Sequence, residues 1–203
     1  MDCNESQKHS KRLGFSENGW CEGGSKCRIL KSPNFDSRPK NATIDLVVLH
    51  NISVPEGIFG GKEIENLFLN QLDTSKKIFK PLINLKVSSH FLIKRTGSLV
   101  QFVSLRERAW HAGQSSFLGR VGCNDFSIGI EIEGTDFEKF NDAQYDTLQN
   151  LIISIQNFLP GLSAITSHSF IAPGRKTDPG PYFDWNRVRE AIETAEKNIF
   201  LFP

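Results

Sequence analysis

Hydrophobic runs along the chain predict four or five β-strands. The run from Ile44 to His50 is almost unbroken and rich in β-branched residues, which is typical of a buried central strand. Residues 87–95 and 98–103 form two further runs on either side of Thr96-Gly97, a pattern that predicts a β-hairpin. A short strand is also expected at residues 163–168.

Residues 126–134 alternate strictly and predict a second strong strand. Ile128, Ile130 and Ile132 fall on one face, and the other face carries Ser127, Gly129, Glu131 and Glu133. Of the two carboxylates, Glu131 lies deeper in the strand, and burying a carboxylate is costly unless it has a partner or a function.

Three segments have helical periodicity. The first spans Lys62 to Leu72. The second follows Asn141, which is expected to cap it in a capping box with Gln144, while Phe140 contacts Tyr145. The third follows Asp184, with its buried face formed by Val188, Ala191, Ile192, Ala195 and Ile199. The pattern predicts an α/β (α+β) fold, in which a mixed central sheet is flanked by these helices.

Composition and charge bear on the domain organisation, the class of partner and the location of the protein. The chain has 203 residues, 38% of them hydrophobic, which suits one domain at 28–203 behind a polar tail at 1–27. A net charge of +1 gives no support for a nucleic-acid partner, and no apolar run is long enough for a membrane span. The first twelve residues lack the apolar segment of a secretory signal, so a cytoplasmic location and reduced cysteines are expected.

The loop from Thr166 to Pro181 contains the most unusual chemistry. Its three prolines and two glycines exclude a regular helix or strand. His168 and Asp178 are possible zinc ligands, and Lys176 lies two residues before the aspartate. A catalytic zinc usually has three protein ligands and one open position. A proline-rich surface turn with polar residues placed by chance remains the alternative.

Two other places offer functional side chains. His50 ends a buried strand, so it is the third candidate ligand, although a hydrogen-bonded structural histidine is the alternative. Trp110 and His111 lie among small residues, where they form either a substrate-facing wall or an aromatic plug on the core. His90, inside a predicted strand, is best explained as a structural histidine.

Several of these segments together resemble the type-2 N-acetylmuramoyl-L-alanine amidases. The resemblance covers about residues 28 to 195 and rests on Val48-Leu-His-Asn-Ile-Ser53, Val87-Ser-Ser-His-Phe-Leu-Ile93, Arg108-Ala-Trp-His-Ala-Gly113, Cys123-Asn-Asp-Phe-Ser-Ile-Gly-Ile-Glu-Ile-Glu-Gly134 and Ile171-Ala-Pro-Gly-Arg-Lys-Thr-Asp-Pro-Gly-Pro181. It implies the peptidoglycan-recognition-like fold of that family. The implied Zn²⁺ ligands are His50, His168 and Asp178, and the implied catalytic residues are Glu131 and Lys176.

The family also implies a substrate. It would be a muramyl peptide, cleaved between the lactyl group of (1,6-anhydro-)N-acetylmuramic acid and L-alanine during cell-wall recycling. Because such a peptide is rich in carboxylates, Lys86, Arg120 and Arg175 are candidate contacts, with solvated surface as their alternative. Trp110 and His111 would line the sugar side, and Asn51 would position substrate or ligands. Lys86 and Gly122 replace arginines expected in the best-matching members.

Three rival functions follow from the same residues. A peptidoglycan-binding module without catalysis would need a ligand or the base to be replaced, and all are present. A cysteine amidase using Cys123 and His111 is disfavoured, because Cys123 precedes a strand and not a helix. A wall-lytic amidase acting on intact peptidoglycan would differ in substrate and, if secreted, would need a signal.

Overall fold

A seven-stranded mixed sheet forms the centre of the protein. The computed structural model describes residues 13–22 and 27–203. The strand order is β13-β12-β5-β11-β6-β7-β3, and all neighbours are parallel except the antiparallel pair β6–β7. The strands are β3 (Cys27–Ile29), β5 (Leu46–Ile52), β6 (Phe91–Ile93), β7 (Leu99–Gln101), β11 (Ser127–Glu133), β12 (Ala164–Ser167) and β13 (Phe200–Phe202).

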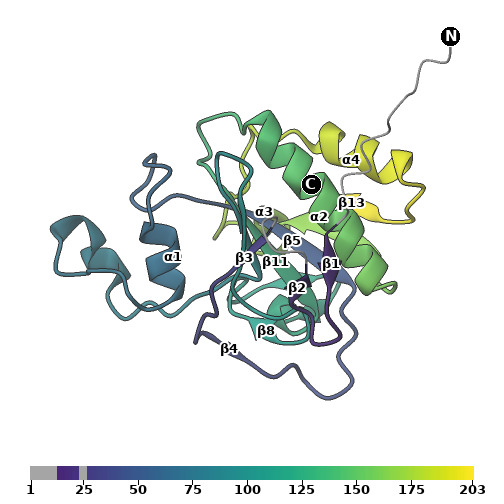
Figure 1. Cartoon of the computed structure of the whole chain (residues 1–203), viewed down its shortest axis with the longest axis horizontal. Helices are drawn as coiled ribbons and strands as arrows, with labels where there is room; N and C mark the ends of the chain where they lie inside the picture. Colours follow the sequence, from purple (N-terminus) through teal and green to yellow (C-terminus); the bar gives the residue numbers. More distant parts are fainter. Residues whose placement is uncertain (1–12, 23–26) are drawn as a thin grey trace, which may run out of the picture.

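Helices cover both faces of this sheet. The helices are α1 (Glu63–Phe68), α2 (Asp142–Phe158), α3 (His168–Ile171) and α4 (Trp185–Thr194), with 3₁₀ turns η2 (Lys77–Leu82) and η3 (Cys123–Asp125). Figure 1 shows α2 and α4 side by side on one face and α1 well away from them. The apolar side chains of α2 and α4 share a core with Ile128, Ile130 and Ile132, whereas those of α1 pack on Leu92, whose side chain points to the opposite face.

Short paired strands complete the fold. They are β1 (Gly14–Phe15) with β2 (Cys21–Glu22), β4 (Phe35–Asp36) with β8 (Arg108–Ala109), and β9 (Ser116–Phe117) with β10 (Arg120–Val121). Among the described residues, no helix combines the length and the apolar character needed to cross a membrane.

The predicted α/β class and the main elements are confirmed. The hairpin 87–103 is present, with Gly97 at a φ of 80° in its turn. At the start of α2, the Gln144 side chain accepts a hydrogen bond from the Asn141 N–H at 3.0 Å, and the Phe140 and Tyr145 rings pack 6.4 Å apart. Asp184 caps α4 through the Asn186 N–H.

The number of strands and the bounds of two helices were predicted wrongly. Four or five strands were expected, but the short edge strands β3 and β13 bring the sheet to seven. The first helix ends at Phe68 instead of Leu72, and the 3₁₀ turn η2 follows it. The last helix ends at Thr194, and Glu196 adopts a φ of 52°, so buried Ile199 precedes β13 and is not part of the helix.

Residues 13–22 lie within the predicted polar tail. Here β1 and β2 form a hairpin, and Phe15 packs on Phe91 and Phe158 with ring centroids 6.0 and 5.6 Å apart. The Cys21 N–H donates to the side chain of Gln101 at 2.7 Å. This part of the segment is therefore docked on the core. Residues 1–12 and 23–26 of the predicted tail lie outside the described residues, and a domain boundary at 27/28 stays a prediction.

Candidate active site

Strand register brings the first three candidate residues together. His50 in β5 is paired with Glu131 in the parallel strand β11. On the other side of β5, Ser167 of β12 is paired with Leu49, and His168 follows directly. All three residues therefore lie towards the carboxyl ends of parallel strands, where α/β sheets commonly bind ligands.

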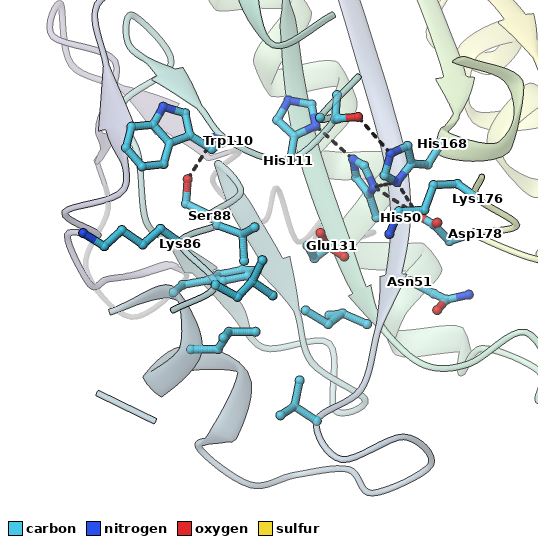
Figure 2. Close-up of a pocket in the computed structure, with 18 of the residues that line it drawn as sticks. His50, Asn51, Lys86, Ser88, Trp110, His111, Glu131, His168, Lys176 and Asp178 are labelled. Carbon is cyan, nitrogen blue, oxygen red and sulfur yellow. Dashed lines mark hydrogen bonds and ion pairs between the residues drawn. The ribbon is translucent and has the colours of Figure 1, made fainter. Parts of the chain in front are cut away.

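His50, His168 and Asp178 converge on one point (Figure 2). The two Nδ1 atoms are 2.9 Å apart, and each is 3.0 Å from Oδ2 of Asp178. One potential ligand atom from each residue lies within 4.8 Å of the others. Two imidazole nitrogens and one carboxylate oxygen are a donor set that suits a divalent transition metal and leaves a coordination position open. The residues present therefore fit a metal ion.

The far sides of both imidazoles are held by the protein. Nε2 of His168 donates to the Ala112 carbonyl oxygen at 3.2 Å. Nε2 of His50 lies 3.0 Å from Nδ1 of His111. These contacts turn both Nδ1 atoms toward Asp178, and metal-binding histidines usually have such partners.

Burial and close mutual contacts set the charge of the cluster. Burial lowers the pKa of His50 to about 4, although the nearby carboxylate of Asp178 opposes this shift. Burial alone would raise the pKa of Asp178, but the imidazoles of His168 and His50 against its carboxylate outweigh burial and hold that pKa below its ordinary value. The aspartate is therefore ionised and His50 neutral near neutral pH, which are the forms that bind metals.

Glu131 faces the cleft beside this cluster. Its side chain is 8% exposed and has no hydrogen-bond partner among the described residues. Burial, followed by the charge of Asp178, raises the pKa of Glu131 well above its ordinary value, and Lys176 opposes the shift. A buried carboxyl group with a raised pKa and free oxygens is typical of a proton-transfer site.

The loop that carries Lys176 and Asp178 is anchored at several points. The Asn51 side chain donates to Oδ1 of Asp136 at 2.6 Å and to the Pro179 carbonyl at 3.1 Å. The Ser169 N–H donates to the Asp178 carbonyl at 3.0 Å. Asn51 thus holds the loop that carries Asp178, and its predicted role in positioning substrate or ligands stays a prediction.

The cluster opens into a cleft of about 510 Å³. Figure 2 shows Trp110 and Lys86 across the cleft from His50 and Asp178. The indole N–H of Trp110 donates to Oδ1 of Asp36 at 3.1 Å, which fixes the ring. Lys86 is exposed, so its ammonium group is free to meet a ligand.

Two predicted arginine contacts are already engaged with protein groups. Arg175 lines the cleft, but its guanidinium donates to the carbonyls of Ala112 and Gln114 at 2.7 and 2.6 Å. Arg120 does not line the cleft: it binds Asp45, just before the start of β5 and thus at the other end of that strand from His50. The structure gives no support to a substrate contact by Arg120.

The remaining histidine and cysteine predictions are settled by their surroundings. His90 is a structural histidine: Nδ1 accepts the Gly129 N–H at 3.0 Å, and Nε2 lies 3.1 Å from the Glu107 carbonyl. Cys123 begins η3 and is fully buried, and burial raises the pKa of its thiol, which makes it a poor nucleophile. His111 points to His50 and Ser127, and not to Cys123.

Sequence reasoning missed two supporting residues. Asn124 accepts the N–H groups of His111 and Ala112 at 3.1 and 2.8 Å, and Asp36 holds Trp110. Asn124 lies inside one of the motifs that carried the family resemblance, but the motif alone does not reveal what its amide contacts.

Comparison with known proteins identifies relatives that are N-acetylmuramoyl-L-alanine amidases. The family model described as N-acetylmuramoyl-L-alanine amidase matches residues 40–181, a range that contains His50, Glu131, His168, Lys176 and Asp178. The 1,6-anhydro-N-acetylmuramyl-L-alanine amidase AmpD of Escherichia coli K12 is 47% identical over 178 residues, which are 87% of this chain and 96% of that protein.

Solved structures agree. A crystal structure of a selenomethionine derivative of AmpD superposes with a TM-score of 0.82 at 45% identity, covering 87% of this chain and 98% of that one. AMPDH3 from Pseudomonas aeruginosa in complex with anhydromuramic pentapeptide gives a TM-score of 0.55 at 28% identity, over 75% of this chain and 61% of that one.

Proposed function

The chain belongs to the N-acetylmuramoyl-L-alanine amidase family, and we propose that it hydrolyses anhydromuramyl peptides between the lactyl group and L-alanine, in peptidoglycan recycling. The observation that carries this proposal is the convergence of His50, His168 and Asp178 beside the carboxyl group of Glu131. The substrate class comes from the relatives: AmpD is named for the anhydromuramyl amide, and AMPDH3 was solved with an anhydromuramic pentapeptide.

Zn²⁺ is the proposed metal. His50 and His168 would bind it through Nδ1 and Asp178 through a carboxylate oxygen, which matches the nitrogen and oxygen ligands of catalytic zinc. When bound, zinc lowers the pKa of a water molecule from about 15.7 to about 7 and polarises a carbonyl group. Metal analysis of the purified protein should give about one zinc per chain.

The chain's own residues supply the proton transfers and part of the charge stabilisation. Glu131 takes the proton of the attacking water and delivers it to the departing amine of L-alanine. A general base of this kind typically contributes about 10²- to 10⁴-fold. Lys176 lies on the anchored loop with Asp178 and offers an ammonium group to the developing oxyanion, where loss of one such group costs about 10²- to 10³-fold.

The rest of the cleft binds the substrate. Trp110 provides an aromatic wall for the sugar, and Lys86 and Arg175 provide positive charge for the peptide carboxylates. Arg175 can bind a carboxylate only through the guanidinium N–H groups that do not donate to the Ala112 and Gln114 carbonyls. His111 is buried behind His50, so its proposed role shifts from sugar contact to support of the metal ligand.

Rival functions have weaker support. A non-catalytic binding module would not need a complete ligand set together with a desolvated carboxyl group. A wall-lytic amidase shares the chemistry and differs only in what enters the cleft. A cytoplasmic location stays a prediction, which fractionation of cells that produce the protein would check.

One assay tests the proposal. Purified protein is incubated with a defined anhydromuramyl tripeptide and, separately, with intact sacculi, and products are identified by mass spectrometry. We expect free tripeptide and anhydro-sugar from the first and much slower release from the second. Equal or faster release from sacculi would support wall lysis, and binding without cleavage in zinc-loaded protein would support a binding module.

A further inference from the structure

Four buried groups are linked in a row between the core and the metal cluster. They are the Cys123 carbonyl, the Ser127 hydroxyl and the imidazoles of His111 and His50. We propose that His111, supported by Ser127, is a positioning residue that keeps the proton of His50 on Nε2 and leaves Nδ1 bare for the metal. This inference rests on the proposed role of His50 as a metal ligand. It concerns residues that touch neither metal nor substrate.

The direction of these hydrogen bonds follows from the contact between Ser127 and the Cys123 carbonyl. The Ser127 hydroxyl oxygen is 2.6 Å from the Cys123 carbonyl oxygen. Two oxygens this close need a proton between them, and a carbonyl has none, so Ser127 donates. Its single proton is then used, and toward His111 the Ser127 oxygen can act only as an acceptor.

The hydrogen bond with Ser127 determines which nitrogen of His111 carries the proton. Its Nε2 lies 3.2 Å from the Ser127 hydroxyl oxygen, so Nε2 carries the proton and donates. A neutral imidazole has one donor and one acceptor nitrogen, which leaves Nδ1 of His111 as an acceptor. Nδ1 lies 3.0 Å from Nε2 of His50, so His50 donates through Nε2. Its Nδ1 lone pair then faces His168 and Asp178.

Packing leaves the His111 ring little freedom. Ser127 and His50 are both buried, and the rings of His50 and His111 meet edge to face with centroids 5.1 Å apart. Behind the ring lies Gly129, where an added Cβ would stand only 2.4 Å from the His111 ring. The glycine in β11 therefore provides the space that the imidazole fills.

Residues 111–112 also orient His168, the second proposed histidine ligand. Asn124 accepts the N–H groups of both His111 and Ala112. The Ala112 carbonyl, fixed in this way, accepts the Nε2–H of His168 at 3.2 Å. Residues 111–112 thus orient both histidines, one through a side chain and one through a backbone carbonyl.

The test begins with the wild-type protein. Nitrogen-15 NMR of the histidine rings, on chelator-treated protein near neutral pH, reports which nitrogens carry protons. We expect protonated Nε2 in both His50 and His111, and a bare Nδ1 in His111. A proton on Nδ1 of His111 overturns the proposal without any substitution.

Variants then test the consequence for metal binding. His111→Leu removes the acceptor, and we expect zinc affinity, measured against a competing chelator, to fall about 10- to 100-fold. His111→Asn places an amide oxygen near the position of Nδ1 and should restore most of the affinity. Ser127→Ala should give a smaller loss in the same direction and replaces His111→Leu if that variant does not fold.

His90→Asn is the matched control. This buried ring lies 5.8 Å from that of His111 but bonds Gly129 and Glu107 instead of His50. It should leave the His50 tautomer and zinc affinity unchanged. Folded variants of His111 and Ser127 with wild-type affinity would refute the positioning role. If the wild-type tautomers are as expected but the protein binds no zinc, the proposed function fails and the hydrogen-bond direction stands.

Discussion

His50 and Glu131 occupy paired positions on two parallel neighbouring strands, β5 and β11. Their side chains project from the same face of the sheet into one cleft. A shift of one residue in this pairing would send one of the two side chains to the opposite face. The register of two core strands therefore sets the distance between the candidate metal ligand His50 and the proposed general base Glu131, and no mobile loop is needed for that relationship.

Replacement of Glu131 by Gln should separate catalysis from metal binding. The amide keeps the shape of the side chain but cannot take a proton, so kcat should fall about 10²- to 10⁴-fold. Because Glu131 is not one of the three converging candidate ligands, zinc content should stay at the wild-type level. Mass-spectrometric rates and metal analysis on the same preparation check both parts. A rate near that of the wild type would remove Glu131 from its proposed role.

Lys176→Gln tests the charge on the anchored loop. The substitution removes the ammonium group but leaves the hydrogen bonds of Asn51 and Asp178 that hold the loop. We expect kcat to fall about 10²- to 10³-fold with little change in zinc affinity. Arg189→Gln, on α4 and outside the residues lining the cleft, is a suitable control for loss of a positive charge. Loss of zinc in Lys176→Gln would instead indicate a structural role.

Local patterns were enough to predict the main parts of the site. Strand alternation placed Glu131 on the face opposite Ile130, and a histidine at the end of a buried run placed His50 at the sheet edge. Both are consequences of the two-residue period of a strand, which a sequence displays directly. The assignment of these residues to one centre with His168 and Asp178 came from the family resemblance.

Contacts between distant segments were beyond the reach of these patterns. His111 lies in a loop and Asn124 in the short 3₁₀ turn η3, and what their side chains contact depends on how β8, η3 and β11 pack. The edge strand β13 is three residues long, too short for periodicity to distinguish it from the end of a helix. Its partner β12 decides the conformation of that segment, and the sequence does not name the partner.

Asp178→Ala should weaken metal binding and activity together. The carboxylate touches both histidine Nδ1 atoms, so its loss removes one candidate ligand and leaves the other two without their counter-charge. Zinc affinity is measured by competition with a chelator, and unchanged affinity would mean that the third ligand is another residue.

Alkylation of thiols in the native wild-type protein should leave activity intact, because Cys123 is fully buried and not part of the cleft.

The stability of the metal-free protein should fall as the pH is lowered from neutral. Burial holds the pKa values of His90 and His111 well below the ordinary 6.5, so neither takes up a proton in the folded state. The unfolded chain does so as the pH falls through about 6.5. Below that value the unfolded state therefore binds more protons, and folding loses up to about 1.4 kcal/mol per pH unit for each histidine.

Urea unfolding of chelator-treated protein at about pH 7.5 and about pH 5.5 measures this loss. The difference between the two unfolding free energies should shrink in His90→Gln, because that variant has one buried histidine fewer to protonate on unfolding. Asp36→Asn provides the control: the pKa of this half-buried carboxyl is lowered by its hydrogen bond with Arg108, so it titrates below both conditions. A pH difference in unfolding free energy that is the same in wild type and His90→Gln would show that His90 accepts a proton without unfolding.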